Sequence, residues 1–359
     1  MPRRIGCIDP GGDRRALAGG YMDRVTDSTE LLFGVYAAGQ VSTVAGPPDD
    51  RAAITDLVRR LQGDAPFVVR EYLHYLGTPP DPERAAVLHP ERVYGELTMP
   101  DRWYLEEHRQ LDLVLCYLPT AVDVDGWLNF IDRAIDRYGR IVRYLQITLE
   151  PNFDIPWIDG SSPGVVAALV HGIAHARKAL DTVGLDAVRI GFSVAESPDW
   201  MGGDAAFWER LAAVPAHEFA DLVDYVGLAL YPDAFSPVAP HGTPGDIDSQ
   251  VKHAIGQLRE ESLPEAHIGS HVPIHISECG SVTGPERTPE HQADSIDHLV
   301  RAVAAVRSRH HVTHLELFGL RDANSAQPEP MAQLGITSSD YRPKAAFETY
   351  RRLVEEFSA

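Results

Sequence analysis

The sequence alternates short apolar segments with longer amphipathic segments throughout residues 31–357. Strands are expected at 31–37, 66–72, 111–118, 141–150, 187–196, 224–231, 273–278 and 312–320. Helices are expected at 47–61, 124–138, 162–180, 204–214, 248–261, from 288 onwards and at 343–357, with a proline-rich loop and only a short helix at 78–102. Strand–helix pairs repeated in this way predict a closed parallel barrel, the (β/α)8 or TIM barrel.

A doubly wound parallel sheet is the alternative α/β topology. No glycine-rich phosphate-binding turn follows the first expected strand, which weighs against a nucleotide-binding fold of that kind. Residues 1–30 are rich in Gly, Asp and Arg and show no hydrophobic period, so we expect an irregular N-terminal extension there. Residues 31–359 are then expected to form a single catalytic barrel domain.

The composition and charge of the chain argue against two classes of partner, nucleic acids and membranes. The 359 residues carry a net charge of −20, from 32 basic and 52 acidic side chains, and this charge repels the phosphates of nucleic acids and anionic lipids. No apolar run approaches the length of a membrane span, and no apolar region follows the basic residues at the N-terminus. The three cysteines lie far apart, as free thiols in a reducing compartment do. We expect a cytoplasmic protein that binds neither nucleic acid nor membrane.

The fourth and seventh expected strands both end on a glutamate that is followed by a turn. The fourth runs into Glu150, followed by Pro151, and the seventh runs into Glu278, followed by a glycine turn at Gly280. A parallel barrel keeps its chemistry at the carboxyl ends of its strands, so both acids are expected at one rim. Two facing carboxyl groups can cleave a glycosidic bond, because one protonates the leaving oxygen while the other attacks or activates water.

The segments around these acids resemble those of a known family. Residues 147–152 (Ile-Thr-Leu-Glu-Pro-Asn) and 274–280 (Ile-His-Ile-Ser-Glu-Cys-Gly) resemble the acid/base and nucleophile strands of clan A glycoside hydrolases. Residues 225–233, 317–322 and 340–347 are also similar to that family. The resemblance implies a retaining O-glycosidase with Glu150 as acid/base and Glu278 as nucleophile. Retention requires the two carboxyl groups to lie about 5–5.5 Å apart, whereas about 6.5–9.5 Å implies inversion.

The resemblance also implies supporting roles. Arg70, at the end of the second strand, is expected beside Glu278, where its charge keeps that carboxylate ionised. Tyr231 is expected to donate its hydroxyl to the same carboxylate. The alternatives are an ion pair of Arg70 with Glu71 or a loop acid, and ordinary rim packing for Tyr231. Glu150 must hold a proton near neutral pH, and a nearby anionic Glu278 raises the pKa of Glu150 in that direction.

Four further residues complete the expected substrate-binding set: Asn152, Trp157, Phe318 and Arg321. They follow the ends of the fourth and eighth strands, and the two aromatic side chains are suited to stack on a sugar ring.

The sequence departs from the family at three places. Leu149 stands where an Asn normally precedes the acid/base glutamate and contacts the sugar 2-hydroxyl, a contact that can supply several kcal/mol in the transition state. Ser281 and Val282 replace an aromatic residue after the nucleophile, and Phe318 replaces a tryptophan. These changes are consistent with a substrate lacking that hydroxyl, an enzyme repurposed for another acid-catalysed reaction, or a weakened hydrolase.

Six of the 16 histidines form two groups close in sequence, His267, His271 and His275, then His310, His311 and His314. Pro273 interrupts any helix through the first group, and the second lies where a helix passes into a strand, so surface or loop histidines are expected rather than a zinc site. We predict an enzyme without metal or cofactor that acts on a small-molecule or oligosaccharide glycoside. The alternatives are a natural-product enzyme that uses the same acids for elimination, cyclisation or rearrangement, and a non-catalytic carbohydrate-binding barrel.

Overall fold

The computed structural model describes residues 30–41, 43–88, 95–196, 203–235 and 246–358. The predicted N-terminal extension therefore lies almost wholly outside the described residues. Within these ranges no helix combines the length and apolarity that a membrane span needs.

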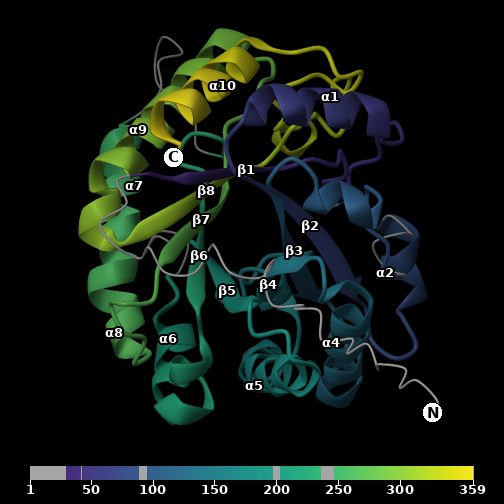
Figure 1. Cartoon of the computed structure of the whole chain (residues 1–359), viewed down its shortest axis with the longest axis vertical. Coiled ribbons are helices and arrows are strands. Elements are labelled where there is room, and N and C mark those ends of the chain that lie inside the picture. Colours follow the sequence, from purple (N-terminus) through teal and green to yellow (C-terminus); the bar gives the residue numbers. More distant parts are fainter. Residues whose placement is uncertain (1–29, 42, 89–94, 197–202, 236–245, 359) are drawn as a thin grey trace, which may run out of the picture.

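Eight parallel strands form a closed barrel in which neighbours in sequence are neighbours in space and β1 closes the ring against β8 (Figure 1). The strands are β1 (Leu32–Tyr36), β2 (Phe67–Tyr75), β3 (Arg109–Tyr117), β4 (Val142–Ile147), β5 (Arg189–Ala195), β6 (Tyr225–Leu230), β7 (Ile274–Cys279) and β8 (Val312–Leu317). The register places Phe33 opposite Phe67 on one side and Leu315 on the other. The predicted (β/α)8 barrel is confirmed.

Helices surround the strands as an outer ring (Figure 1). The α-helices are α1 (Arg51–Gln62), α2 (Pro82–Val87), α4 (Val124–Tyr138), α5 (Val165–Val183), α6 (Ala205–Ala212), α7 (Ile247–Gln257), α8 (Leu263–Glu265), α9 (Pro289–His310) and α10 (Ala345–Phe357). A π-helical turn, Leu258–Ser262, joins α7 to α8. Short 3₁₀ turns lie at Asp101–Leu105, Asp159–Ser161, Ala216–Glu218, Ala220–Leu222 and Pro330–Ala332.

Local sequence signals fix where several of these helices begin. Asp50 caps α1 by accepting the backbone N–H groups of Ala52 and Ala53. Thr288 caps α9 and is followed by Pro289 in the first turn. The apolar faces of the helices pack against the outside of the barrel, and Trp127 of α4 is fully buried there.

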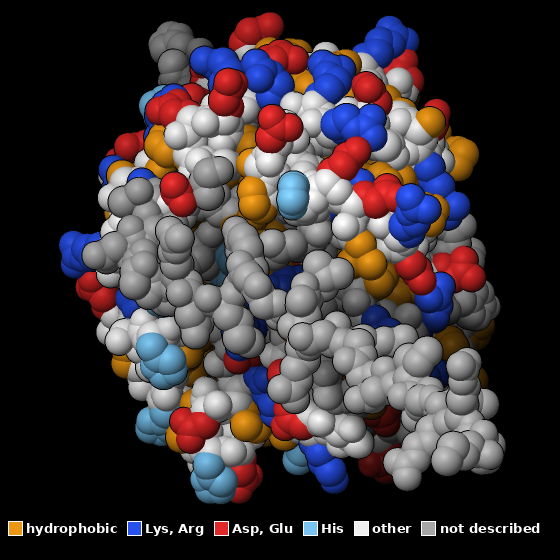
Figure 2. Space-filling view, in the orientation of Figure 1, with side chains coloured by type: hydrophobic (Ala, Val, Ile, Leu, Met, Phe, Trp, Pro, Cys, Tyr) orange, Lys and Arg blue, Asp and Glu red, His pale blue; other side chains and the backbone are white. Residues whose placement is uncertain are grey.

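The outer surface mixes charges of both signs. Figure 2 shows acidic and basic side chains interspersed over the helices in the upper part of the view. Arg301 of α9 pairs with Glu356 of α10 at 2.8 Å, and Arg60 of α1 reaches Glu348 of α10 at 3.3 Å. Exposed pairs of this kind contribute little individually, about 0–1 kcal/mol.

Two of the histidines that were expected on the surface or in loops lie inside the barrel, near the N-terminal ends of the strands. His275 of β7 and His314 of β8 stack with ring centroids 3.6 Å apart, and both are buried. Tyr225 stacks on His275 at 4.2 Å, and Tyr144 meets His314 edge-on at 4.7 Å. Burial lowers the pKa of His275 and brings that of His314 to about 3, so both rings are neutral packing groups. The expectation was wrong for these two residues.

Two strand ends differ from the predicted boundaries in ways that shape the rim. β4 ends at Ile147, and the chain then turns through positive φ angles at Thr148 (68°) and Glu150 (48°). β2 continues to Tyr75, so Arg70 lies in the middle of its strand rather than at its end. Positive φ is uncommon for residues other than glycine and often marks a functional turn.

Candidate active site

Glu278 lies next to the end of β7 and is surrounded by donors. The Tyr72 hydroxyl donates to Oε1 at 2.6 Å, and the Tyr231 hydroxyl donates to Oε2 at 3.0 Å. Arg70 Nη2 lies 3.6 Å from Oε1. Hydrogen bonds and positive charge at a carboxylate both stabilise its ionised form.

Arg70 is fully buried inside the barrel and joins several strands. Its Nε donates to the Tyr72 hydroxyl at 2.6 Å, its Nη2 donates to Gln146 Oε1 at 2.8 Å, and its Nη1 pairs with Asp112. Arg70 was expected to pair either with Glu278 or with Glu71, and the structure shows the contact with Glu278. Glu71 instead accepts hydrogen bonds from the hydroxyls of Tyr104 and Thr98. Arg70 therefore supports Glu278 from inside the barrel, from the middle of β2.

A second buried acid lies near this network. Glu316 of β8 is almost fully buried, and burial together with the nearby Asp112 carboxylate raises the pKa of Glu316 well above its ordinary value. Burial also raises the pKa of Asp112, while Arg70 lowers it. Both pKa values are therefore raised, and the rise for Glu316, to which burial and the Asp112 charge both contribute, favours its protonated form.

Glu150 sits in a different environment. It is buried, and within the described part of the chain no side chain is hydrogen-bonded to its carboxyl group. Burial raises the pKa of Glu150 well above its ordinary value, the Glu278 charge raises it further, and Arg70 opposes the rise. A carboxyl group in these surroundings keeps its proton, as a general acid must.

Asp159, which the sequence analysis missed, supports the turn that carries Glu150. Its Oδ2 accepts the backbone N–H groups of Leu149 at 2.8 Å and Tyr117 at 2.6 Å, which ties the end of β4 to the end of β3. The residue is fully buried, and burial raises its pKa to about 7. Its charge also raises the pKa of Glu150.

No sequence signal marks Asp159, because an acid in an irregular loop is ordinarily a surface residue. Tyr72 was also missed, although a signal existed for it. Residues two apart on a strand point to the same side, so Tyr72 accompanies Arg70 into the barrel.

A cavity of about 110 Å³ opens beside Glu278. Its apolar lining consists of Tyr36, Val41, Leu88, Leu149, Trp157, Ile158, Phe318 and Met331. Its polar lining consists of Gln40, Tyr72, His74 and Glu278. Phe318 stacks on Tyr36 with ring centroids 4.8 Å apart and the planes inclined by 9°. Two of the predicted substrate-binding residues, Trp157 and Phe318, thus share a cavity with Glu278.

The structure places Asn152 and Arg321 in other surroundings. Asn152 Nδ2 donates to the Ala195 carbonyl at 2.9 Å and to Asp204 at 2.8 Å, and its Oδ1 accepts from the Ala195 N–H. Arg321 donates to the Pro47 carbonyl at 2.8 Å and to Asp49 at 2.9 Å. Neither residue lines the cavity beside Glu278, since both are engaged in holding loops together.

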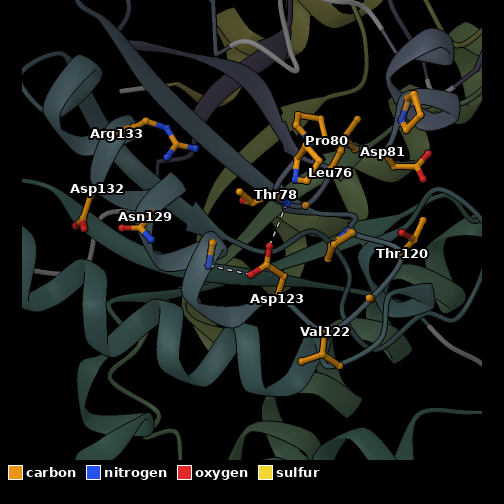
Figure 3. A pocket seen from close by; sticks show the side chains of 16 residues that line it. Leu76, Thr78, Pro80, Asp81, Thr120, Val122, Asp123, Asn129, Asp132 and Arg133 are labelled. Atoms are coloured by element: carbon orange, nitrogen blue, oxygen red, sulfur yellow. Dashed lines mark hydrogen bonds between the residues drawn. The ribbon is translucent and has the colours of Figure 1, made fainter.

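A larger groove of about 890 Å³ lies between the loops that follow β2 and β3 (Figure 3). Asp123 points toward its centre and accepts the backbone N–H groups of Thr78 and Gly126. Neither Glu150 nor Glu278 lines this groove. Its size exceeds that of the cavity, but the paired acids are elsewhere.

No metal was predicted for the candidate site. Across the described ranges no three His, Cys, Asp or Glu side chains are grouped as metal ligands. The absence of a metal or cofactor stays a prediction.

The structure resembles solved glycoside hydrolases. A GH1 beta-glucosidase from Exiguobacterium antarcticum B7 is 15% identical with a TM-score of 0.59, over 91% of this chain and 98% of that chain. A family 39 glycoside hydrolase from Bacteroides cellulosilyticus WH2 is 17% identical (TM-score 0.57; 91% and 64% covered). A b-glucuronidase from Ruminococcus gnavus is 11% identical (TM-score 0.56; 91% and 51% covered).

No protein-family model and no curated protein matches the sequence. The structural likeness, at 11–17% identity, is a likeness of fold. The (β/α)8 barrel predicted from the sequence is the fold that this chain shares with these solved structures.

Proposed function

We propose that the protein is a retaining glycoside hydrolase with Glu150 as acid/base and Glu278 as nucleophile. One observation carries the proposal: the two carboxyl groups lie in opposite environments. Glu278 receives two hydroxyl donors and lies near Arg70, whereas Glu150 is buried with a raised pKa and no such donors among the described side chains. One acid is suited to attack as an anion and the other to give up a proton.

In the first step a Glu278 oxygen forms a bond to the anomeric carbon of the substrate. The bond from that carbon to the leaving oxygen breaks, and Glu150 gives this oxygen its proton. In the second step Glu150, now a carboxylate, takes a proton from water, and the water oxygen displaces Glu278 from the anomeric carbon. Both acids return to their starting states, and the released sugar keeps its original configuration.

The roles can be tested with Glu150→Gln and Glu278→Gln, which preserve shape and remove the titrating group. Each is expected to lower turnover of an aryl glycoside by about a thousandfold or more. Glu196→Gln is the matched control, because Glu196 also follows a strand end, that of β5, but lines a separate cavity with Asp204 and Trp208, and it should keep wild-type turnover. Nuclear magnetic resonance of the first-formed sugar should show retention.

Wild-type turnover in either Glu150→Gln or Glu278→Gln contradicts the assignment. A product with inverted configuration would leave the two acids as the catalytic pair. It would show that Glu278 activates water as a base and does not attack the sugar itself.

A second candidate function is favoured by Leu149, which lines the cavity where the family has an amide. In this alternative the same acids catalyse elimination, cyclisation or rearrangement of a small natural product. The two functions differ in the fate of water. Hydrolysis in oxygen-18-labelled water places one label in the sugar, whereas elimination, cyclisation and rearrangement leave the product unlabelled.

A further inference from the structure

The cavity beside Glu278 is unusual for a sugar site because most of its wall is apolar. Leu149, Phe318 and Met331 contribute aliphatic, aromatic and thioether surface, and Trp157 adds an indole face. Sugar rings carry several hydroxyl groups, and each needs a partner when it leaves water.

The polar groups that remain are largely engaged with one another. The Tyr36 hydroxyl donates to the Gln40 carbonyl at 2.8 Å. The Tyr72 hydroxyl accepts from Arg70 and donates to Glu278. Apart from Tyr72 and Glu278, the described lining of the cavity offers the polar side chains of Gln40 and His74, which are too few to pair with every hydroxyl of a fully hydroxylated ring.

The volume of the cavity restricts the ligand as well. An apolar protein cavity of about 150 Å³ accommodates benzene, so about 110 Å³ leaves room for at most one six-membered ring. The ring next to Glu278 must therefore meet the apolar wall itself, without a layer of water between.

We propose, building on the hydrolase function above, that the substrate is a glycoside whose ring beside Glu278 is deoxygenated and carries methylene or methyl groups where common hexoses carry hydroxyls. The apolar wall of Leu149, Phe318 and Trp157 favours this ring, because a hydroxyl group that faces the wall would have no hydrogen-bond partner there. Glu278 and Glu150 act on it by the two steps already given.

Calorimetry on Glu278→Gln tests the inference with three phenyl glycosides of one configuration: the hexoside, its 2-deoxy form and its 2,6-dideoxy form. This variant lacks the nucleophile, so the ligands stay intact. Affinity is expected to rise about tenfold with each hydroxyl removed, the change that corresponds to about 1.4 kcal/mol. Affinity that stays level or falls along the series overturns the inference.

Leu149→Asn, made in the same background, adds an amide to the wall and is expected to reduce or reverse the preference. Leu105→Asn is its matched control, because Leu105 is 59% exposed and lies outside the cavity. The control should keep the preference of the parent. A preference that survives Leu149→Asn unchanged contradicts the role of this wall.

The binding series and the turnover test fail independently. If the wild-type protein hydrolyses no glycoside while affinity still rises along the series, the hydrolase proposal fails and the selection of a deoxygenated ring stands. If the wild-type protein hydrolyses hexosides and affinity falls along the series, the hydrolase proposal stands and this inference is overturned.

Discussion

The surroundings of Glu278 and of Glu150 differ although both carboxyl groups are buried at the same end of the barrel. Around Glu278, Tyr72, Tyr231 and Arg70 supply hydrogen bonds and positive charge. Around Glu150, burial and neighbouring acids raise its pKa. Two buried carboxyl groups can thus differ in their tendency to ionise, because the hydrogen-bond donors and charges around each group differ, and the proposed division of roles between the two acids rests on this difference.

Among changes to the surroundings of the two acids, the largest effect is expected from disturbing the donors around Glu278. Tyr72→Phe removes the hydroxyl that joins Arg70 to the carboxylate, and a hydrogen bond to a charged group contributes about 1.5–3 kcal/mol. We expect kcat/KM for an aryl glycoside to fall by roughly ten- to a hundredfold.

Tyr75→Phe is the control for this prediction. Tyr75 lies on the same strand, but its hydroxyl bonds to Thr78 and Asp123, away from the cavity. Equal losses in Tyr72→Phe and Tyr75→Phe would show a general effect on stability and would remove the special role given to Tyr72.

A smaller effect is expected from the Glu150 side. Asp159→Asn removes a charge that raises the pKa of Glu150, while its side-chain oxygen can still accept from Leu149 and Tyr117. Glu150 must be protonated to act, so activity is lost as pH rises through its pKa. Without the Asp159 charge this loss should occur at lower pH, measured as kcat/KM against pH. An unchanged alkaline limb contradicts the coupling.

The same variant has a stability signature. The pKa of Asp159 is about 7 in the folded protein, against about 3.9 for an unfolded chain. Between these values the folded state holds a proton that the unfolded state has released, so this group's contribution to stability is lost as pH rises from about 4 to 7. Asp159→Asn should flatten that part of the curve of unfolding free energy against pH.

Sequence reasoning reached the barrel and the contacts that follow from strand order. Apolar segments alternate with amphipathic segments because buried strands alternate with helices that cover them, and this alternation predicted the barrel. Arg70 and Tyr231 were placed beside Glu278, and the structure has both contacts. These contacts were predictable because strand order determines which side chains share the barrel interior.

The contacts of Asp159, Asn152 and Arg321 were not predicted, because they depend on loop geometry. Asp159 reaches Leu149 from an irregular segment, and no periodic pattern indicates where such a segment folds back. Asn152 and Arg321 belong to motifs that suggested substrate contact, yet nearby backbone carbonyls and carboxylates engage both side chains. Motif position predicts the rim but not the direction in which a loop side chain turns.

The difference in ionisation between Glu150 and Glu278 can be measured directly by infrared difference spectroscopy of the wild-type protein against Glu150→Gln and Glu278→Gln at neutral pH. We predict that Glu150→Gln removes a protonated-carboxyl band and that Glu278→Gln removes a carboxylate band. The opposite pattern, or loss of a carboxylate band in both variants, would contradict the division of roles between the two acids.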